Sequence, residues 1–262
     1  MKEMEKEMFC FQCEQTAACK GCTGKAGVCG KKSDTANLQD ALTGALVDLA
    51  SAEAGNAFAN DETYRIIIEG LFTTLTNVSF DDVAISALME RAKRETKRLS
   101  SADRADCDIA QLWTGDEDIR SLKSLLLFGL RGMAAYAYHA LVLGYSDEAV
   151  NRFLCEGLRA VGADMTVDEL LPLVLKVGEV NLSCMAMLDK ANTTTYGTPS
   201  PATVSLKVEK GPFIVVTGHD LRDLRLLLEQ TEGRGVNVYT HGEMLPAHAY
   251  PELRKFAHLK GN

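Results

Sequence analysis

The feature that most constrains this chain is a run of cysteines and glycines near its amino terminus, FCFQCEQTAACKGCTGKAGVCGKK (residues 9–32). Five of the eight cysteines lie there: Cys10, Cys13, Cys19, Cys22 and Cys29. In that order they are separated by two, five, two and six residues. Thiols at this density indicate a set of disulfides, a zinc site or an iron–sulfur cluster.

The redox compartment helps to separate these three alternatives. The first residues, MKEMEKEM, alternate acids with bases and lead into no apolar run of the kind that a secretory signal needs. No stretch has the roughly 18 uninterrupted apolar residues of a membrane span. We therefore expect a cytoplasmic protein with no membrane association. Thiols stay reduced in that compartment, which favours a metal over disulfides.

The residues between the cysteines bear on which metal is bound. Glycines at Gly21, Gly24, Gly27 and Gly30 let a loop fold tightly around a cluster and turn N–H groups toward its sulfurs. Zinc accepts four cysteines equally well, but a zinc ribbon usually places a β-hairpin between its cysteine pairs. No segment of this loop reads as a strand. The pattern favours iron–sulfur, leaves zinc open, and leaves one cysteine more than four ligands require.

The composition of the whole chain is that of a globular protein. Of its 262 residues 46% are hydrophobic and 24% are charged, which is typical of that class. The formal net charge of −8 disfavours a broad electrostatic attraction to nucleic acid or to anionic lipid. We therefore predict that the chain has no nucleic-acid partner.

Helical periodicity dominates residues 35–191, which read as two three-helix bundles of about 35–100 and 117–191, after a cysteine-rich loop over 1–34. The first helix is expected to begin at the cap Thr35. Its apolar stripe consists of Leu38, Ala41, Leu42, Ala45, Leu46 and Leu49.

A repeated pattern supports the division into two bundles. Glu-Gly-Leu begins at Glu69 and again at Glu156, each time ten residues before an expected helix cap, Ser79 or Thr166. Each cap is followed three residues later by an acid. The pattern favours two copies of one ancestral unit, although unrelated helix–turn–helix segments also resemble one another.

The pattern changes at residue 192. A linker rich in Thr, Pro and Gly precedes a buried strand (PFIVVTG), a helix (HDLRDLRLLLEQTEG), a second strand (VNVYTHG) and a second helical segment (EMLPAHAYPELRKFA). This order indicates a parallel α/β sheet over 192–262. So few strands cannot bury both faces of such a sheet, so we expect only the first part of a larger domain.

His219 follows the first of these strands, and Glu243 follows the second. Ligands of parallel α/β sheets bind beyond the carboxyl ends of the strands, so the two side chains can face one cavity if the strands are neighbours. An imidazole and a carboxylate together suit a metal site with mixed nitrogen and oxygen donors. His241 could also reach it. The alternative is that His219 and Glu243 simply begin the helices that follow them.

Several segments together closely resemble the hybrid-cluster proteins, also called prismane proteins or hydroxylamine reductases. They are MFCFQCEQTA, CGKKSDTANLQDAL, DKANTTTYGTP, VTGHDLRDL, LLEQTEG and NVYTHGEMLPAHAYPELRKF. The resemblance runs in order along essentially the whole chain, and TTTYG and THGEMLPA are specific to that family. It implies two three-helix bundles followed by Rossmann-like α/β domains, of which this chain resembles the first half. A carboxy-terminal half is therefore expected.

The resemblance also implies two clusters. A cubane would be held by Cys10, Cys13, Cys22 and Cys29, with Cys19 spare. The gap of eight residues between Cys13 and Cys22 matches the subgroup with [4Fe–4S], although the last gap is one residue longer than is common, and [2Fe–2S] is the alternative. The second centre would be the hybrid [4Fe–2O–2S] cluster, with His219 and Glu243 among its ligands if the rest of the protein is present.

The implied activity is that of an oxidoreductase acting on a small nitrogen–oxygen compound. Hydroxylamine would be reduced to ammonia and water, or nitric oxide to nitrous oxide, with electrons from a redox donor protein. His241 is the candidate proton donor. The alternatives are an enzyme like carbon monoxide dehydrogenase and a non-catalytic iron–sulfur electron-transfer fragment.

Overall fold

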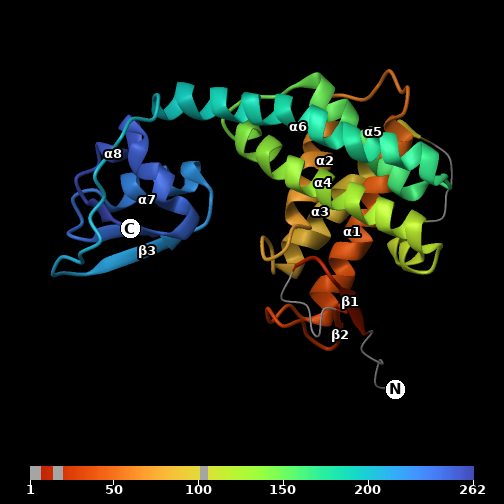
Figure 1. The fold of residues 1–262 in the computed structure, drawn as a ribbon, viewed down its shortest axis with the longest axis horizontal. Coiled ribbons are helices and arrows are strands. Elements are labelled where there is room, and N and C mark those ends of the chain that lie inside the picture. Colours follow the sequence, from red (N-terminus) through yellow and green to blue (C-terminus); the bar gives the residue numbers. More distant parts are fainter. Residues whose placement is uncertain (1–6, 14–19, 101–105) are drawn as a thin grey trace. The chain divides into compact units, whose positions relative to one another are not determined.

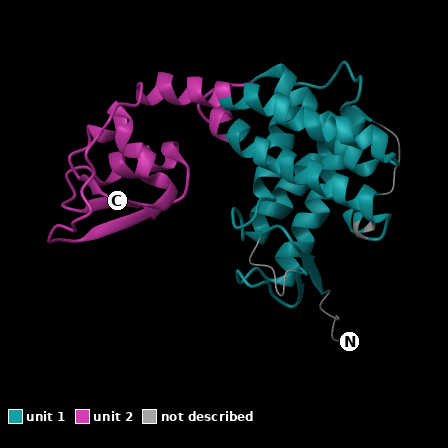
Figure 2. Ribbon diagram, in the orientation of Figure 1, with its two compact units in different colours: residues 1–138, 147–185 teal, residues 139–146, 186–262 magenta. Residues whose placement is uncertain are grey.

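The structure is a computed structural model that describes residues 7–13, 20–100 and 106–262. Helices occupy its first part and a small parallel sheet its second, so the predicted multidomain α and α/β fold class is confirmed (Figure 1). The chain forms two compact units: residues 1–138 with 147–185, and residues 139–146 with 186–262 (Figure 2). The domain boundaries expected from the sequence stay a prediction.

The first unit consists mainly of helices, two of which continue into the second unit over residues 139–141 and 186–196. In chain order they are α1 (Ser33–Glu53), α2 (Asp61–Thr73), α3 (Asp82–Leu99), the 3-10 turn η2 (Ile109–Trp113), α4 (Glu117–Leu141), α5 (Glu148–Gly162) and α6 (Val167–Tyr196). Helix α1 contacts α2, α3 and α5. Of the apolar stripe predicted for this helix, Leu42, Ala45, Leu46 and Leu49 are buried in the core, whereas Leu38 is half-buried and Ala41 is exposed.

The repeated Glu-Gly-Leu marks the same packing contact in both halves of this unit. A β-carbon built at Gly70 of α2 would lie 2.6 Å from Leu46 Cδ2 of α1. A β-carbon built at Gly157 of α5 would lie 2.7 Å from Leu130 Cδ2 of α4. In each case the second helix of a group presents a glycine to a buried leucine of the first. The glycine lets the two helices approach closely, and this shared contact accords with the proposed internal repeat.

Two of the predicted helix caps are wrong. Helix α1 begins at Ser33, ahead of Thr35, and the cap of α3 is Asp81 in place of Ser79. The Asp81 carboxylate accepts hydrogen bonds from the N–H groups of Val83 and Ala84. Aspartate is as good a cap as serine, so the residue nearest the start of the amphipathic pattern takes the role. At α6 the expected pair does form, because Thr166 N–H donates to Glu169 Oε2 at 2.8 Å.

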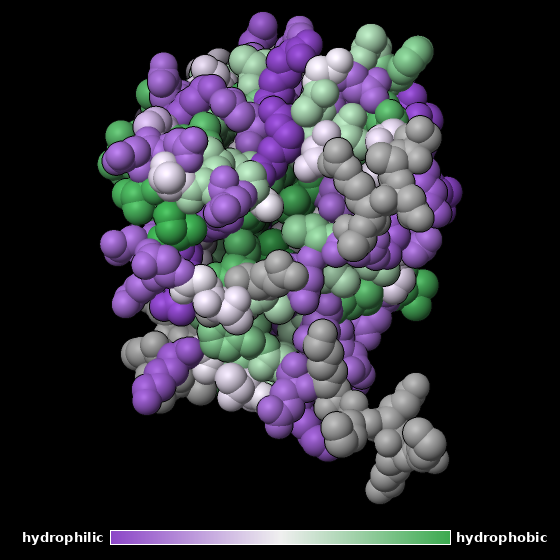
Figure 3. Space-filling model, turned by 90° about the vertical axis from the view of Figure 1, so that its right-hand side faces the viewer, coloured by the Kyte–Doolittle hydropathy of each residue, from purple (hydrophilic) through white to green (hydrophobic). Residues whose placement is uncertain are grey.

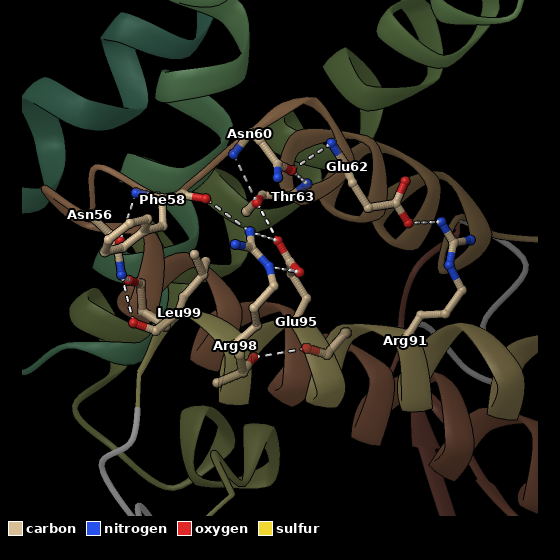
Figure 4. Close-up of polar contacts among 12 residues, drawn as sticks. Asn56, Phe58, Asn60, Glu62, Thr63, Arg91, Glu95, Arg98 and Leu99 are labelled. Carbon is tan, nitrogen blue, oxygen red and sulfur yellow. Dashed lines mark hydrogen bonds and ion pairs between the residues drawn. The ribbon is translucent and has the colours of Figure 1, made fainter.

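A polar network joins α2 and the loop before it to α3 (Figure 4). Glu95 of α3 is buried and accepts hydrogen bonds from Thr63 Oγ1 and from the Arg98 guanidinium. Arg98 also donates to the carbonyl of Phe58, and Asn56 Nδ2 donates to the carbonyl of Leu99 at 2.6 Å. The loop from α1 to α2 is thereby held on the carboxyl end of α3.

Helix α6 differs from expectation at its carboxyl end. It continues to Tyr196, past the linker expected from residue 192. By length and composition it is long and apolar enough to cross a membrane, with 11% of its most apolar window buried, and a single such helix is weak evidence. Apolar side chains exposed along it are Val167, Leu171, Leu175, Leu182 and Met185.

The view in Figure 3 shows one face of the molecule on which apolar side chains gather near the centre among polar ones.

The second unit holds a three-stranded parallel sheet. Its elements are β3 (Phe213–Thr217), α7 (Leu221–Thr231), β4 (Asn237–His241), the 3-10 helix η3 (Gly242–Ala249), α8 (Pro251–Arg254) and β5 (Leu259–Gly261), with sheet order β3-β4-β5. The third strand was not expected. The core includes Tyr196, Leu228 and Phe256. The prediction that the first strand is buried is wrong, because β3 lies at the edge and Phe213 and Val215 are exposed.

Candidate metal centres

The cysteine-rich loop contains two short strands, β1 (Met8–Cys10) and β2 (Cys22–Gly24). They pair antiparallel, and Cys10 lies opposite Cys22. This pairing contradicts the expectation that the loop has no strand, so the absence of a hairpin no longer argues against zinc. Pairing of two segments of only three residues gives no periodic signal, which is why the sequence pattern missed it.

Four cysteines of the loop line a single pocket: Cys10, Cys13, Cys22 and Cys29. All four are thiols, and Cys19 lies outside the described residues. Across the described ranges, no three His, Cys, Asp or Glu side chains are arranged to hold one metal ion. Four thiols around one pocket are a ligand set that both zinc and an iron–sulfur cluster use.

The backbone of the loop suits a group rich in sulfur. The N–H of Val28 donates to Cys22 Sγ at 3.5 Å, the kind of contact that stabilises a thiolate. Gly21 has a φ of +110°, and a β-carbon there would lie 2.8 Å from the ring of Phe9, so only glycine fits beside Cys22. Gly30, with a φ of +85°, makes the turn after Cys29.

The second candidate centre lies at the carboxyl ends of β3 and β4. The two strands are parallel neighbours, with Thr217 opposite His241. His219 Nε2 and Glu243 Oε2 consequently lie 4.0 Å apart, and their side chains are 68% and 79% exposed. The structure therefore brings together the two residues that the sequence had singled out. The pair is open to solvent on most of its surface, so further ligands have room to approach.

His241 ends β4 and is also exposed. It stands at the start of η3 without a side-chain hydrogen bond to the helix backbone. The structure thus places it at the same end of the sheet as Glu243, two residues along the chain.

One side-chain contact beside this centre has no counterpart in the sequence pattern. Asp220, next to His219, lies 3.5 Å from His139 Nδ1 and caps α7 by accepting from the N–H of Asp223. Burial alone would raise the pKa of Asp220, but hydrogen bonds from His139 and from backbone N–H groups outweigh it and lower the pKa. The carboxylate therefore holds the turn that carries His219. His139 is distant in sequence, and the spacing of residues contains no signal for this contact.

The cysteines outside the loop have other surroundings. Cys155 and Cys184 are fully buried, and burial raises the pKa of each thiol to about 12. The prediction that both are core residues is confirmed. Burial also raises the pKa of Cys107. None of the three lines the pocket of the loop cysteines.

Comparison with known proteins shows which proteins this chain is similar to. A sequence profile of the Prismane/CO dehydrogenase family matches residues 8–262. A hydroxylamine reductase of Desulfitobacterium hafniense (strain Y51) is 44% identical over 97% of the chain and 52% of its own length. One of Solidesulfovibrio magneticus is 46% identical over the same shares. The chain thus spans about half the length of the curated relatives it matches.

Among solved structures, a carbon monoxide dehydrogenase from Thermococcus sp. AM4 is similar to 93% of the chain. The similarity covers 41% of that protein, with 17% identity and a TM-score of 0.31.

Proposed function

This chain belongs to the Prismane/CO dehydrogenase family, and we propose that it is part of an iron–sulfur oxidoreductase that reduces hydroxylamine to ammonia and water. The observation that carries the proposal is the pocket shared by four cysteines, in a chain 44% identical to proteins named hydroxylamine reductase. The resemblance described above gives those cysteines their place in such an enzyme. The relatives are about twice as long, so a carboxy-terminal half is part of the proposal.

In this proposal Cys10, Cys13, Cys22 and Cys29 hold a [4Fe–4S] cubane, with [2Fe–2S] as the alternative. A cubane supplies one-electron transfer when it is bound. Cys10 and Cys13 are partly exposed and Cys29 is exposed, so the loop offers a redox donor protein a short path to the cluster. Cys22 is buried and held by the Val28 N–H, which anchors the inner side.

His219 and Glu243 would be ligands of a hybrid [4Fe–2O–2S] cluster that the other half completes. That cluster would supply a Lewis acid and an electron store for cleavage of the N–O bond. The reaction consumes two electrons and two protons for each hydroxylamine converted to ammonia and water. His241 is the proposed proton donor, because it stands at the same strand end as Glu243 and is accessible.

Reduction of nitric oxide to nitrous oxide is the second candidate reaction. It requires the same electron delivery and a small nitrogen–oxygen substrate, so the residues of this chain would have the same roles. An electron-transfer fragment without catalysis would hold the cubane alone. An enzyme like carbon monoxide dehydrogenase is disfavoured, because the curated relatives quoted above carry the name hydroxylamine reductase.

Anaerobic iron and sulfide analysis with EPR spectroscopy tests the proposal. About four irons and four sulfides per chain are expected for the 262 residues alone, and about eight irons when the carboxy-terminal half is present. The longer protein should then turn over hydroxylamine or nitric oxide with a reduced donor. Iron-free protein with zinc, or with the four thiols joined in disulfides, would overturn the proposal.

A further inference from the structure

A lysine is buried at the wall of the cysteine pocket. Lys31 follows the turn at Cys29 and Gly30, is 1% exposed, and lines the pocket together with the four cysteines. Its carbonyl accepts a hydrogen bond from the N–H of Gly27 at 2.8 Å, which fixes the loop on both sides of Cys29. Lysine is almost never fully buried unless its charge is paired, so this position calls for a counter-charge.

The partner that the structure gives Lys31 is neutral. Its Nζ donates to Gln39 Oε1 of α1 at 2.7 Å. Gln39 is held in turn by its Nε2, which donates to the carbonyl of Ser79 at 3.0 Å. Among the described residues, no carboxylate lies within ion-pair distance of Lys31. A hydrogen bond to an amide orients the ammonium group but does not neutralise it.

A second buried cation approaches the same loop from α4. Arg131 is 5% exposed, and its guanidinium donates to Thr43 Oγ1 and Thr74 Oγ1 at 3.0 Å each. Burial lowers the pKa of Arg131 to about 10, and the charges of Asp40 and Cys10 act against that shift. Lys31 and Arg131 thus both place positive charge inside the first unit, with neutral amide and hydroxyl groups as their hydrogen-bond acceptors.

We propose that Lys31 is the counter-charge of the cluster held by the four loop cysteines. This inference rests on the proposed function, because it requires the cluster to be bound. The irons and inorganic sulfides of a [4Fe–4S] cluster together with four thiolates carry net negative charge, and reduction adds one more electron. A fixed ammonium group in a water-poor wall favours the reduced form, since net charge near a cluster is one of the factors that set its potential. Lys31 thereby makes the cluster easier to reduce by a donor protein.

The test compares the midpoint potential of the cluster in the whole protein, prepared without oxygen and titrated under EPR. Lys31→Met removes the charge and keeps most of the side-chain volume. Lys32→Met makes the same change one residue away, where the side chain is exposed. We expect a shift to lower potential in Lys31→Met and a much smaller shift in Lys32→Met, because water screens an exposed charge.

Each outcome supports or contradicts the proposed role of Lys31 as the counter-charge of the cluster. A cluster that is present in Lys31→Met at the wild-type potential, or an equal shift in both variants, overturns the inference. If Lys31→Met loses the cluster, Lys31→Arg must regain it, since charge is the property at issue. Loss of the cluster in Lys31→Arg as well overturns the inference in favour of a purely structural role. Wild-type protein without a cluster refutes the proposed function instead, so the two failures are distinguishable.

Discussion

The backbone of Gly70 and the side chain of Leu46 leave no room for a methyl group between α2 and α1. A β-carbon at Gly70 would lie 2.6 Å from Leu46 Cδ2, and Leu46 is fully buried, so it has nowhere to move. The same relationship holds between Gly157 and Leu130. The two contacts are equivalent positions of two helix groups, and they lead to a direct test of the packing.

Gly70→Ala and Gly157→Ala should each destabilise the protein by about 1–3 kcal/mol, because overpacking outweighs the gain in helix propensity. Urea unfolding followed by circular dichroism measures this. The matched control is Gly132→Ala in α4, where an added β-carbon meets nothing within 4 Å. That variant should gain about 0.5–1 kcal/mol from propensity alone. Equal effects at all three glycines would show that close packing is not the reason for glycine.

His219→Ala and Glu243→Gln should lower the iron content of the whole protein without affecting the cubane. In protein stripped of its clusters the melting temperature should hardly change, because the two side chains are mostly exposed and a charged contact in water contributes only about 0–1 kcal/mol. Iron analysis and EPR of both clusters measure the effect. Glu232→Gln, at an exposed carboxylate after α7, is the matched control. Full iron occupancy in both variants would remove the pair from the ligand set.

His241→Gln should reduce turnover of the whole protein and alter its pH profile. Glutamine keeps a polar side chain at that place, but it cannot act as a proton donor. Iron content should stay at the wild-type level, which separates a proton donor from a ligand. The measurement is the pH dependence of hydroxylamine reduction. Unchanged turnover and an unchanged profile would remove His241 from the mechanism.

Alkylation should distinguish the two classes of cysteine. At pH 8 in cluster-free folded protein, iodoacetamide should modify Cys10, Cys13 and Cys29 and leave Cys155 and Cys184 unmodified. The pKa of both buried thiols is raised to about 12, so they stay protonated and unreactive at that pH. Peptide mass spectrometry reads out each site. Bound cluster should protect the loop cysteines, and their equal modification with and without iron would contradict the ligand assignment.

Glu95 should make stability depend on pH below its ordinary pKa of 4.5. The hydrogen bond from Arg98 lowers its pKa, burial opposes this, and the hydrogen bond from Thr63 lowers it further. A carboxyl whose pKa is lower in the folded state stabilises that state fully above pH 4.5, and the contribution is lost as the pH falls below that value.

Glu95→Gln should therefore destabilise the protein by about 1 kcal/mol at pH 7, with a smaller difference from wild type near pH 3. Urea unfolding at both values measures this. Glu90→Gln, on an exposed position of the same helix, serves as the control and should change stability little. A loss for Glu95→Gln that is the same at both pH values would mean that charge is not involved.

The parts of the fold that could be predicted from the sequence are those set by residues close together in the chain. The helices, the strands β3 and β4 and the pairing of His219 with Glu243 follow from periodicity and from the geometry of parallel strands. The Glu-Gly-Leu repeat is recognisable in the sequence, but only the structure shows that its glycine allows a close contact between two helices. The exact cap of α3 was missed because Ser79 and Asp81 are both good caps and only the start of the packed helix selects one.

The sequence by itself determined the order of helices and strands and the clustering of the thiols, because these depend on residues close together in the chain. The pairing of β1 with β2, the burial of Lys31 on Gln39 and the contact of His139 with Asp220 were decided only by the tertiary structure. Each of these joins residues whose relative positions depend on how whole helices and loops pack. The burial of Lys31 at the cysteine pocket and the partner of Asp220 beside the second centre belong to that class, since no spacing of residues encodes them.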